Sequence, residues 1–356
     1  MRRGAEREIH GLGTRMIRRG HQVRLLTSAP EGLTSRATVD GMPVRYVRPP
    51  QAAPLARRGL SDVAAFTSIA LPAVLATRGV DLVHAWHYGD GWAAVQAKRV
   101  HPRRPVVLKL TGTVVPDRME HVRIDRKLFR EAIAGADEVW CNSRYALDVM
   151  APFGVSMQIV PAGVDLDRFQ PAVARSERPI VLCTSAPDDP RKRLVDVVDA
   201  WPAVLDVVSD AQLVVAGHAS AATRRSLLAR LPTDAVGTVE LVGDLADAAL
   251  SEAYATAHAV VAPALHEALG LTTIEALASG TPVAGARSGA TEELVAEGTG
   301  ALFEPADAAA CAAAMVDALA LAGQPATVDR CRAAALPYGW DAVTDEVDRR
   351  WSALRA

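Results

Sequence analysis

Short apolar runs alternate with helical stretches along the whole of this 356-residue chain, and this alternation limits the fold more than any other feature. Parallel strands joined by helices pack as doubly wound α/β sheets, so that is the predicted fold class. The chain is long for one domain, and the polar, proline-bearing stretch at 170–179 marks a break between two. The predicted strands cover 22–28, 44–49, 81–87, 105–111, 137–142, 180–185, 212–217, 239–243, 258–263, 282–286 and 300–303. The predicted helices of the first half cover 4–19, 60–78, 91–100, 121–135 and 143–152.

The most informative segment runs from a short buried strand through a Gly-Leu turn into an apolar helix, and it holds Glu267 and Glu275. The backbone amides of Gly270, Leu271 and Thr272 fall at the free amino end of that helix, where an anion or a sugar hydroxyl can be held. Glu275 lies about one turn further in, where its carboxylate can accept two hydrogen bonds from a vicinal diol such as ribose. Because charged residues are mostly exposed, two glutamates at this spacing would mean little without their flanks.

The flanking sequence carries the stronger signal. Pro263, the run Gly280-Thr281-Pro282-Val283 and Gly289, taken with the two glutamates, resemble the donor-site signature of the retaining glycosyltransferases of family 4. Further segments that resemble this family in order and spacing are GHQVRLLT at 20–27, DLVHAWH at 81–87, DEVWCNSRYALDVM at 137–150, QIVPAGVDLDRFQP at 158–171 and VELVGDLADAALSEAYATAHAVVAP at 239–263. The resemblance therefore covers nearly the whole chain.

The family implies the GT-B fold, in which two doubly wound, Rossmann-like domains face each other across a cleft. The expected domains are 1–170 on the acceptor side and 171–337 for the nucleotide sugar, followed by a helix at 338–356 that crosses back to the first domain. In this scheme Glu275 holds the ribose, while Glu267 and the amides at 270–272 hold sugar and phosphate oxygens. Gly243 and Gly4 are further expected donor contacts.

A basic triplet is the candidate for diphosphate binding. Arg191, Lys192 and Arg193 follow a predicted strand and open a helix, so their side chains can reach a phosphate there. Lys192 matches the family lysine best and is the expected catalytic cation, with Arg191 or Arg193 as substitutes for an arginine that has no clear counterpart. The departure is that Thr184-Ser185 stands where the family usually has Gly-Arg.

In the first half, His84 and His87 lie at the carboxyl end of a predicted strand. His87 is the candidate for positioning an acceptor or taking its proton, whereas His84 is nearer the strand interior and is more typical of a structural imidazole. After the next strand, Thr111 precedes Gly112 where the family commonly has His-Gly. A threonine can hydrogen-bond the donor sugar but cannot carry a proton near neutral pH.

The beginning of the chain also departs from the family pattern. Gly4, Ala5 and Glu6 already open a helix that a strand and a glycine turn normally precede. We therefore expect the central first strand of the first domain to be absent from this sequence. Either an in-frame extension of roughly 15–25 residues precedes it, or the first domain is compromised.

Charge and composition set the remaining expectations. Residues 1–170 carry 25 Lys+Arg against 16 Asp+Glu, or +9, and residues 171–356 carry 14 against 25, or −11. A basic half favours an anionic or membrane-associated acceptor, and nothing indicates nucleic acid. The four cysteines have no metal-ligand spacing, and Asp165-Leu166-Asp167 is expected to form a turn, not a metal site. Without an 18-residue apolar stretch or a signal peptide, the expected location is the cytoplasm, with a peripheral site at the inner membrane surface as the alternative.

The resemblance implies a metal-independent retaining glycosyltransferase that moves a hexosyl unit from a UDP- or GDP-sugar to an acceptor hydroxyl. In such a reaction the departing phosphate of the donor would take the acceptor's proton. No cofactor is expected beyond the nucleotide-sugar donor. Two alternatives stay open. One is a non-catalytic nucleotide-sugar-binding paralogue, and the other is an epimerase or hydrolase of the same fold.

Overall fold

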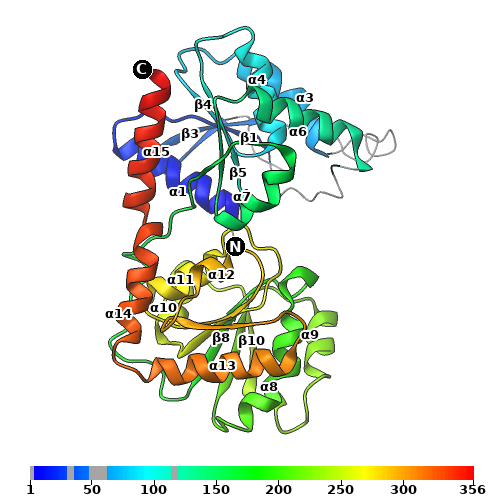
Figure 1. The fold of residues 1–356 in the computed structure, drawn as a ribbon, viewed down its shortest axis with the longest axis vertical. Helices are drawn as coiled ribbons and strands as arrows, with labels where there is room; N and C mark the ends of the chain where they lie inside the picture. Colours follow the sequence, from blue (N-terminus) through cyan, green and yellow to red (C-terminus); the bar gives the residue numbers. More distant parts are fainter. Residues whose placement is uncertain (1–3, 30–35, 48–61, 114–118, 120) are drawn as a thin grey trace. The chain divides into compact units, whose positions relative to one another are not determined.

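The computed structural model describes residues 4–29, 36–47, 62–113, 119 and 121–356, and Figure 1 shows its course. The chain divides into two compact units. One consists of Ala162–Ala342 and includes Gly4, and the other consists of Ala5–Pro161 and Val343–Ala356. The last helix, α15 (Trp340–Arg355), therefore begins in one unit and continues in the other.

The unit formed by Ala162–Ala342 contains a six-stranded parallel sheet in the order β10-β9-β8-β11-β12-β13. Counted along the chain from β8, the order is 3-2-1-4-5-6, so the direction of winding reverses between β8 and β11. The strands are β8 (Ile180–Thr184), β9 (Gln212–Ala216), β10 (Val239–Gly243), β11 (Ala259–Ala262), β12 (Val283–Ala286) and β13 (Gly300–Phe303).

Both faces of this sheet are buried under helices, as its parallel strands require. Val181 and Cys183 of β8 pack into one apolar cluster, and Leu182 between them packs into another. The first cluster includes α8 (Leu194–Leu205), α9 (Ala221–Leu228) and α13 (Ala308–Ala322). The second includes α10 (Asp247–Thr256), α11 (Leu271–Ala278) and α14 (Thr327–Ala335), and α12 (Thr291–Leu294) supplies Leu294 to it.

The other unit contains two sheets. The first has the order β1-β3-β2, formed by β1 (Leu25–Ser28), β2 (Arg36–Val39) and β3 (Met42–Val47), and the second has the order β4-β5-β6-β7, formed by β4 (Val83–Ala85), β5 (Val106–Leu110), β6 (Glu138–Cys141) and β7 (Gln158–Ile159). Its helices are α1 (Gly4–Arg18), α3 (Asp62–Leu75), α4 (Tyr88–Lys98), α6 (Arg123–Gly135) and α7 (Arg144–Met150).

One strand departs from the parallel pairing of this fold class. β2, which the sequence did not predict, pairs antiparallel with β3. Asp40 and Gly41 join the two strands with φ angles of 47° and 81°. Two successive positive φ angles are those of a type I′ hairpin turn, which Asp-Gly favours. The dipeptide was therefore a readable signal for this hairpin.

The chain is helical from Gly4 onward, as predicted. Among the described residues no strand pairing joins β1 to β4, so the two sheets of this unit remain separate. The expected central strand and upstream extension stay predictions.

A buried polar and aromatic cluster covers one side of the four-stranded sheet. Lys109 of β5 forms an ion pair with Glu8 of α1, and the two side chains are only 3% and 4% exposed. Lys109 also donates to the Pro161 carbonyl at 3.2 Å and lies 5.5 Å from the centre of the Trp86 ring. Such a pair holds α1 on the sheet, because removing one partner would leave a buried charge uncompensated.

No single helix in the described ranges is both long and apolar enough to cross a membrane, although Ala308–Ala322 and Thr327–Tyr338, bent by 108°, meet the length and composition test as a pair. All four cysteines are buried free thiols. Burial raises the pKa of Cys183 and Cys331 to about 12 each.

Candidate functional site

The reversal of strand order brings together two loops at the carboxyl ends of β8 and β11. Open α/β sheets bind ligands at this kind of switch point, because the connections on either side run away from each other and leave a crevice. The loop after β8 carries the basic triplet, and the loop after β11 carries Glu267. The Leu265 backbone N–H donates to the Arg191 carbonyl at 2.9 Å, so the two loops are directly joined.

Lys192 and Glu267 form an ion pair across this junction. Their side chains are 28% and 27% exposed, so the pair is partly open to solvent. The structure thus brings together the two second-half residues that the sequence nominated as catalytic. A cation and a carboxylate that lie together at a switch point can hold a phosphate and a sugar hydroxyl, respectively.

The loop that carries Glu267 is held in an unusual backbone conformation. His266 has a φ of 55°, in the left-handed region that non-glycine residues rarely adopt. The His266 N–H donates to Ser288 Oγ at 3.0 Å, and the Ala290 N–H donates to the Glu267 carbonyl at 2.9 Å. Gly289 allows this approach, since a Cβ atom there would lie 2.5 Å from the Glu267 carbonyl oxygen.

Helix α11 begins as the sequence predicted, directly after Gly270. Gly270 is the N-cap residue with a φ of 80°, and no side chain caps the helix start. The Thr273 N–H donates to the Gly270 carbonyl at 2.9 Å. The amides of Gly270, Leu271 and Thr272 precede it at the helix start, a position that suits anions. Glu275 lies further along α11 and is only 3% exposed, so it is not a solvated surface residue.

The hydroxyl of Tyr254 interacts with Glu275, and the sequence did not reveal this contact. Tyr254 of α10 is 1% exposed, and its hydroxyl lies 2.5 Å from Thr184 Oγ1 at the end of β8. Thr184 Oγ1 in turn lies 3.3 Å from Thr272 Oγ1. Burial first, and the charge of Glu275 second, raise the pKa of Tyr254 well above its ordinary value. The phenol is therefore protonated at any physiological pH.

The three residues of the basic triplet are placed differently from one another. Arg191 has a side chain that is 65% exposed and is paired with Asp189 at 2.7 Å. Arg193 has a φ of 48° and makes two hydrogen bonds to Asp196, at 2.6 and 2.8 Å. Because Asp196 is buried and also accepts from the Ala306 N–H, Arg193 is tied into the fold and is less available to a ligand than Arg191 or Lys192.

Two hydroxyls near this junction have no hydrogen-bond partner within the part of the chain that the structure describes. They are Ser185 Oγ, directly after β8, and Thr273 Oγ1 in the first turn of α11. Buried polar groups are nearly always paired, so unpaired ones at a switch point are suited to a polar ligand. Ser185 occupies the position where the family usually has arginine.

Gly243 and Gly4, the two glycines expected to contact the donor, lie in different surroundings. Gly243 ends β10 with a φ of 74°, and its carbonyl accepts from the Gly217 N–H at 2.7 Å. It therefore lies at the carboxyl edge of the same sheet. Gly4 belongs to the compact unit of Ala162–Ala342, whereas the rest of α1 belongs to the other unit.

In the other unit, His87 is exposed and is the N-cap of α4, where its Nδ1 accepts from the Gly89 N–H at 3.3 Å. An Nδ1 atom that accepts places the ring hydrogen on Nε2, which can donate to a hydroxyl. Thr111 follows β5, and its carbonyl accepts from Asn142 Nδ2 at 3.0 Å. Both residues lie at the carboxyl edge of the four-stranded sheet.

His84 is packed among aromatic side chains, as its position in the strand indicated. Its ring stacks on Trp86 at 4.6 Å and meets the edge of Trp140 at 4.9 Å. Burial, aided by the charge of Lys109, lowers the pKa of His84 to about 3. A ring that stays neutral and enclosed in this way belongs to the packing of the unit.

Asp90 is a half-buried carboxyl that the sequence analysis missed. It lies in the first turn of α4, three residues after His87. Burial raises its pKa to about 7, although a hydrogen bond from the Trp86 backbone opposes part of the shift. The readable signal was an aspartate in the first helical turn after a strand, close to the strand ends at which α/β sheets bind ligands.

The Asp165-Leu166-Asp167 triplet forms a turn, as predicted. Asp165 Oδ1 accepts from the N–H groups of Asp167 and Arg168 at 3.2 and 3.1 Å. In the described ranges, no three His, Cys, Asp or Glu side chains gather as metal ligands would. Metal independence stays a prediction.

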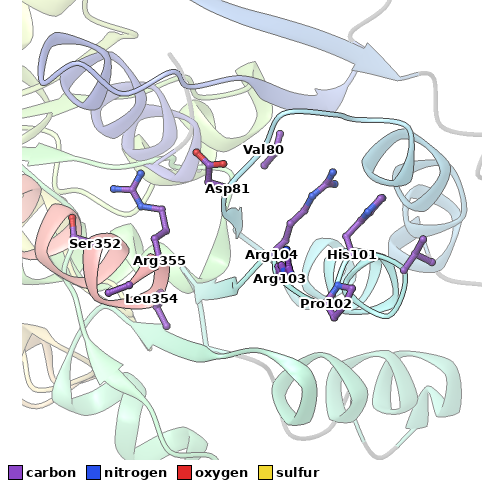
Figure 2. Close-up of a pocket in the computed structure, with 11 residues that line it drawn as sticks. Val80, Asp81, His101, Pro102, Arg103, Arg104, Ser352, Leu354 and Arg355 are labelled. Atoms are coloured by element: carbon purple, nitrogen blue, oxygen red, sulfur yellow. The ribbon is translucent and has the colours of Figure 1, made fainter.

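A separate hollow of about 980 Å³ lies at the opposite, amino-terminal edge of the four-stranded sheet (Figure 2). It is lined by His101, Arg103, Arg104 and Arg355, among others. His101 Nε2 is 3.4 Å from the carbonyl of Leu75, the last residue of α3, and Arg355 Nε donates to the Trp351 carbonyl near the end of α15. Basic side chains favour such helix carboxyl ends, and none of the nominated residues lies here.

Two family models match the chain. Residues 2–168 match Glycosyltransferase Family 4, and residues 178–320 match Glycosyl transferases group 1. The chain belongs to glycosyltransferase family 4. Together the two matches include the loops of both units that carry the nominated side chains.

Among curated relatives, a GDP-mannose-dependent alpha-(1-6)-phosphatidylinositol dimannoside mannosyltransferase of Mycobacterium tuberculosis is 31% identical over 204 residues, which are 54% of this chain and 52% of the relative. The MMP alpha-(1->4)-mannosyltransferase of Mycolicibacterium hassiacum is 35% identical over 159 residues, which are 43% of this chain and 38% of the relative. The chain thus spans about half the length of the curated relatives it matches.

Among solved structures, sucrose-phosphate synthase from Thermosynechococcus elongatus has a TM-score of 0.78 at 20% identity, covering 99% of this chain and 94% of that one. Anabaena HepE in complex with UDP and glucose has a TM-score of 0.76 at 18% identity, covering 99% and 96%. At these identities the likeness establishes the fold alone. The fold is GT-B, with two Rossmann-like domains.

We expect Gly289→Ala to lower the free energy of unfolding by about 2–3 kcal/mol, because alanine is strained at a positive φ and its Cβ meets the Glu267 backbone. Urea unfolding measures this change. Gly237→Ala is the matched control, because a Cβ at Gly237 has no neighbour within 4 Å. Equal losses in the two variants would contradict the assigned role of Gly289.

We expect Asp90 to make the stability of the protein depend on pH. Its pKa is raised from 3.8 to about 7, so between these values the folded protein keeps a proton that the unfolded chain has released. This carboxyl therefore makes the protein less stable as pH rises from about 4 to 7, with no further change above that. Relative to wild type, Asp90→Asn should gain about 1–3 kcal/mol at pH 8 and nothing near pH 4. Thermal unfolding of both proteins across this range tests the difference, and a gain that does not vary with pH would refute it.

Proposed function

We propose that this protein is a retaining glycosyltransferase that moves a hexosyl unit from a nucleoside-diphosphate sugar to an acceptor hydroxyl. The observation that carries the proposal is the meeting of Lys192 and Glu267 at the switch point between β8 and β11, beside the start of α11. A diphosphate and a sugar need a cation, backbone amides and hydroxyl acceptors in one place, and the groups at this junction support that role.

Each group takes a defined role in the proposal. Lys192, with Arg191 at the solvent side, holds the diphosphate, and the amides of Gly270, Leu271 and Thr272 bind phosphate or sugar oxygens. Glu267 accepts hydrogen bonds from sugar hydroxyls, and Glu275 accepts them from the ribose. Gly243 gives the donor close access to the backbone at the end of β10. Arg193, tied to Asp196, supports the loop.

The transfer step follows from this arrangement. The bond between the sugar's anomeric carbon and the phosphate oxygen breaks, and a bond to the acceptor oxygen forms on the same face. The acceptor's proton passes to the departing phosphate oxygen, so the protein needs little acid-base chemistry of its own. The main protein contribution is the stabilisation of negative charge on the leaving diphosphate by Lys192 and the helix amides. His87 and Thr111 are proposed to orient the acceptor and the donor sugar.

The names of relatives and the charge of the first half of the chain suggest a donor and an acceptor. Relatives in this family are named for GDP-mannose and for phosphatidylinositol mannosides, so GDP-mannose is the first donor to test. The excess of positive charge in residues 1–170 favours an anionic acceptor, lipid-linked or free. Action in the cytoplasm at a membrane surface agrees with both.

The decisive experiment incubates the protein with radiolabelled GDP-mannose or UDP-glucose, with and without phosphatidylinositol vesicles or small polyol acceptors. We expect label in an acceptor product whose new bond has the anomeric configuration of the donor. Glu275→Gln should weaken donor binding by about 1.5–3 kcal/mol, because it removes the charge that strengthens the ribose hydrogen bonds. Glu292→Gln, at an exposed position on α12, is the control. Donor affinity that is identical in both variants would contradict the assigned site.

The same assay tests metal independence. We expect EDTA to leave the rate unchanged, since Lys192 and the helix amides take the part that a divalent cation plays in other phosphoryl sites. A rate that falls in EDTA and returns with manganese or magnesium would refute this.

The alternative is a nucleotide-sugar-binding protein without turnover. It is favoured by Thr111, which cannot transfer a proton as the imidazole usual in the family does. Donor binding without transfer or release of sugar in the assay would establish it, and release of free sugar without an acceptor would point to hydrolysis.

A further inference from the structure

A buried chain of hydroxyl groups ends at the carboxylate proposed to bind ribose. It runs from Thr184 on β8 to Tyr254 on α10, whose hydroxyl lies 2.5 Å from Thr184 Oγ1 and which also interacts with Glu275 on α11. Thr272 stands one helical turn before Glu275, and its hydroxyl is 3.3 Å from that of Thr184. Three different elements therefore contribute to one polar group inside an otherwise apolar layer.

The direction of these hydrogen bonds follows from what each group can do. An ionised carboxylate only accepts, so a hydrogen bond between Tyr254 and Glu275 requires the phenol to donate. The phenol oxygen can then accept the single proton of the Thr184 hydroxyl, since the contact to Tyr254 at 2.5 Å is much shorter than the one to Thr272 Oγ1 at 3.3 Å. The Thr272 hydroxyl has its own acceptor in the Thr184 carbonyl at 3.5 Å. The raised pKa of Tyr254 keeps that phenolic proton in place over the whole working range. Tyr254 is thus a directed donor to the Glu275 carboxylate.

We propose that Tyr254, held by Thr184, is a positioning residue that orients the Glu275 carboxylate to receive both hydroxyls of the donor's ribose. This inference rests on the proposed function. It also explains the Thr184 departure, because a glycine at that position would leave the buried phenol oxygen without this hydroxyl donor. The threonine is part of the site, although it lies behind the group that touches the ligand.

A positioning residue matters here because a wrongly oriented Glu275 carboxylate loses hydrogen bonds to the ribose. Two hydrogen bonds to a vicinal diol need the carboxylate plane within a narrow range of orientation, and a side chain with three rotatable bonds does not keep it unaided. Packing fixes the stem of Glu275, but only a directed donor fixes its terminal rotation. Loss of Tyr254 Oη therefore weakens recognition of the diol specifically, and not of the diphosphate.

Calorimetric binding of GDP and of 2′,3′-dideoxy-GDP separates these contributions. We expect wild type to prefer GDP by about tenfold or more, the size of one or two charge-assisted hydrogen bonds. Tyr254→Phe should reduce that preference to about threefold or less while it leaves the affinity for the dideoxy compound nearly unchanged. Thr184→Val should reduce the preference by a smaller factor, and it carries the test if Tyr254→Phe does not fold.

The matched control is Thr238→Val. This change removes another buried hydroxyl partner in the same unit, since Trp201 Nε1 donates to Thr238 Oγ1 at 2.8 Å. It should lower stability without a change in the preference for ribose. If Tyr254→Phe and Thr238→Val differ only in stability, the positioning role is refuted.

Failure of this inference can be told apart from failure of the proposed function. If Glu275→Gln abolishes the preference for ribose and Tyr254→Phe keeps it, the donor site stands and the role of Tyr254 is wrong. If Glu275→Gln also keeps the wild-type preference, the assignment of the ribose carboxylate itself fails. The same would follow if wild type did not distinguish the two nucleotides.

Discussion

The reversal of strand order between β8 and β11 is the constraint on which the rest of the site depends. Connections leave these adjacent strands in opposite directions, and such a reversal leaves a crevice at the carboxyl ends of the strands. Lys192 and Glu267 are 75 residues apart in sequence, yet they become neighbours only because their strands are adjacent. Gly289 then allows the close backbone approach that supports the loop of Glu267, and Gly270 allows the positive φ at which α11 begins.

The fold was predictable from the sequence wherever burial was complete. Every strand of the six-stranded sheet was expected within a residue or two of its observed bounds, because strands buried on both faces give continuous apolar runs. The strands that were missed are the exceptions to this rule. β2 alternates exposed and half-buried residues, and β7 has only two residues, both exposed. Neither strand produces an apolar run. Only the Asp40-Gly41 turn indicated the presence of β2.

The candidate site was predictable as far as its loop residues, and the limit has a physical reason. Lys192, Glu267 and Gly270 follow strand ends, and strand ends can be read from hydropathy. The helical side chains that lie behind these loops cannot be predicted in this way. A tyrosine in helix α10 cannot be distinguished from a packing residue until its neighbours are known. Arg193 shows the opposite error. Its partner Asp196 is three residues away on the same helix start, so the competing ion pair was visible in the sequence.

The Lys192–Glu267 pair also bears on how residues 171–356, with a net charge of −11, can bind a diphosphate. An unpaired lysine held ready in a partly buried crevice would lose solvation without compensation, whereas the pair keeps its charge satisfied before the ligand arrives. Under the proposed function, the diphosphate replaces Glu267 as the partner of Lys192. The carboxylate is then released toward the sugar hydroxyls. Binding of the phosphate and recognition of the sugar thereby become one coupled event, because the same exchange of partners prepares both groups.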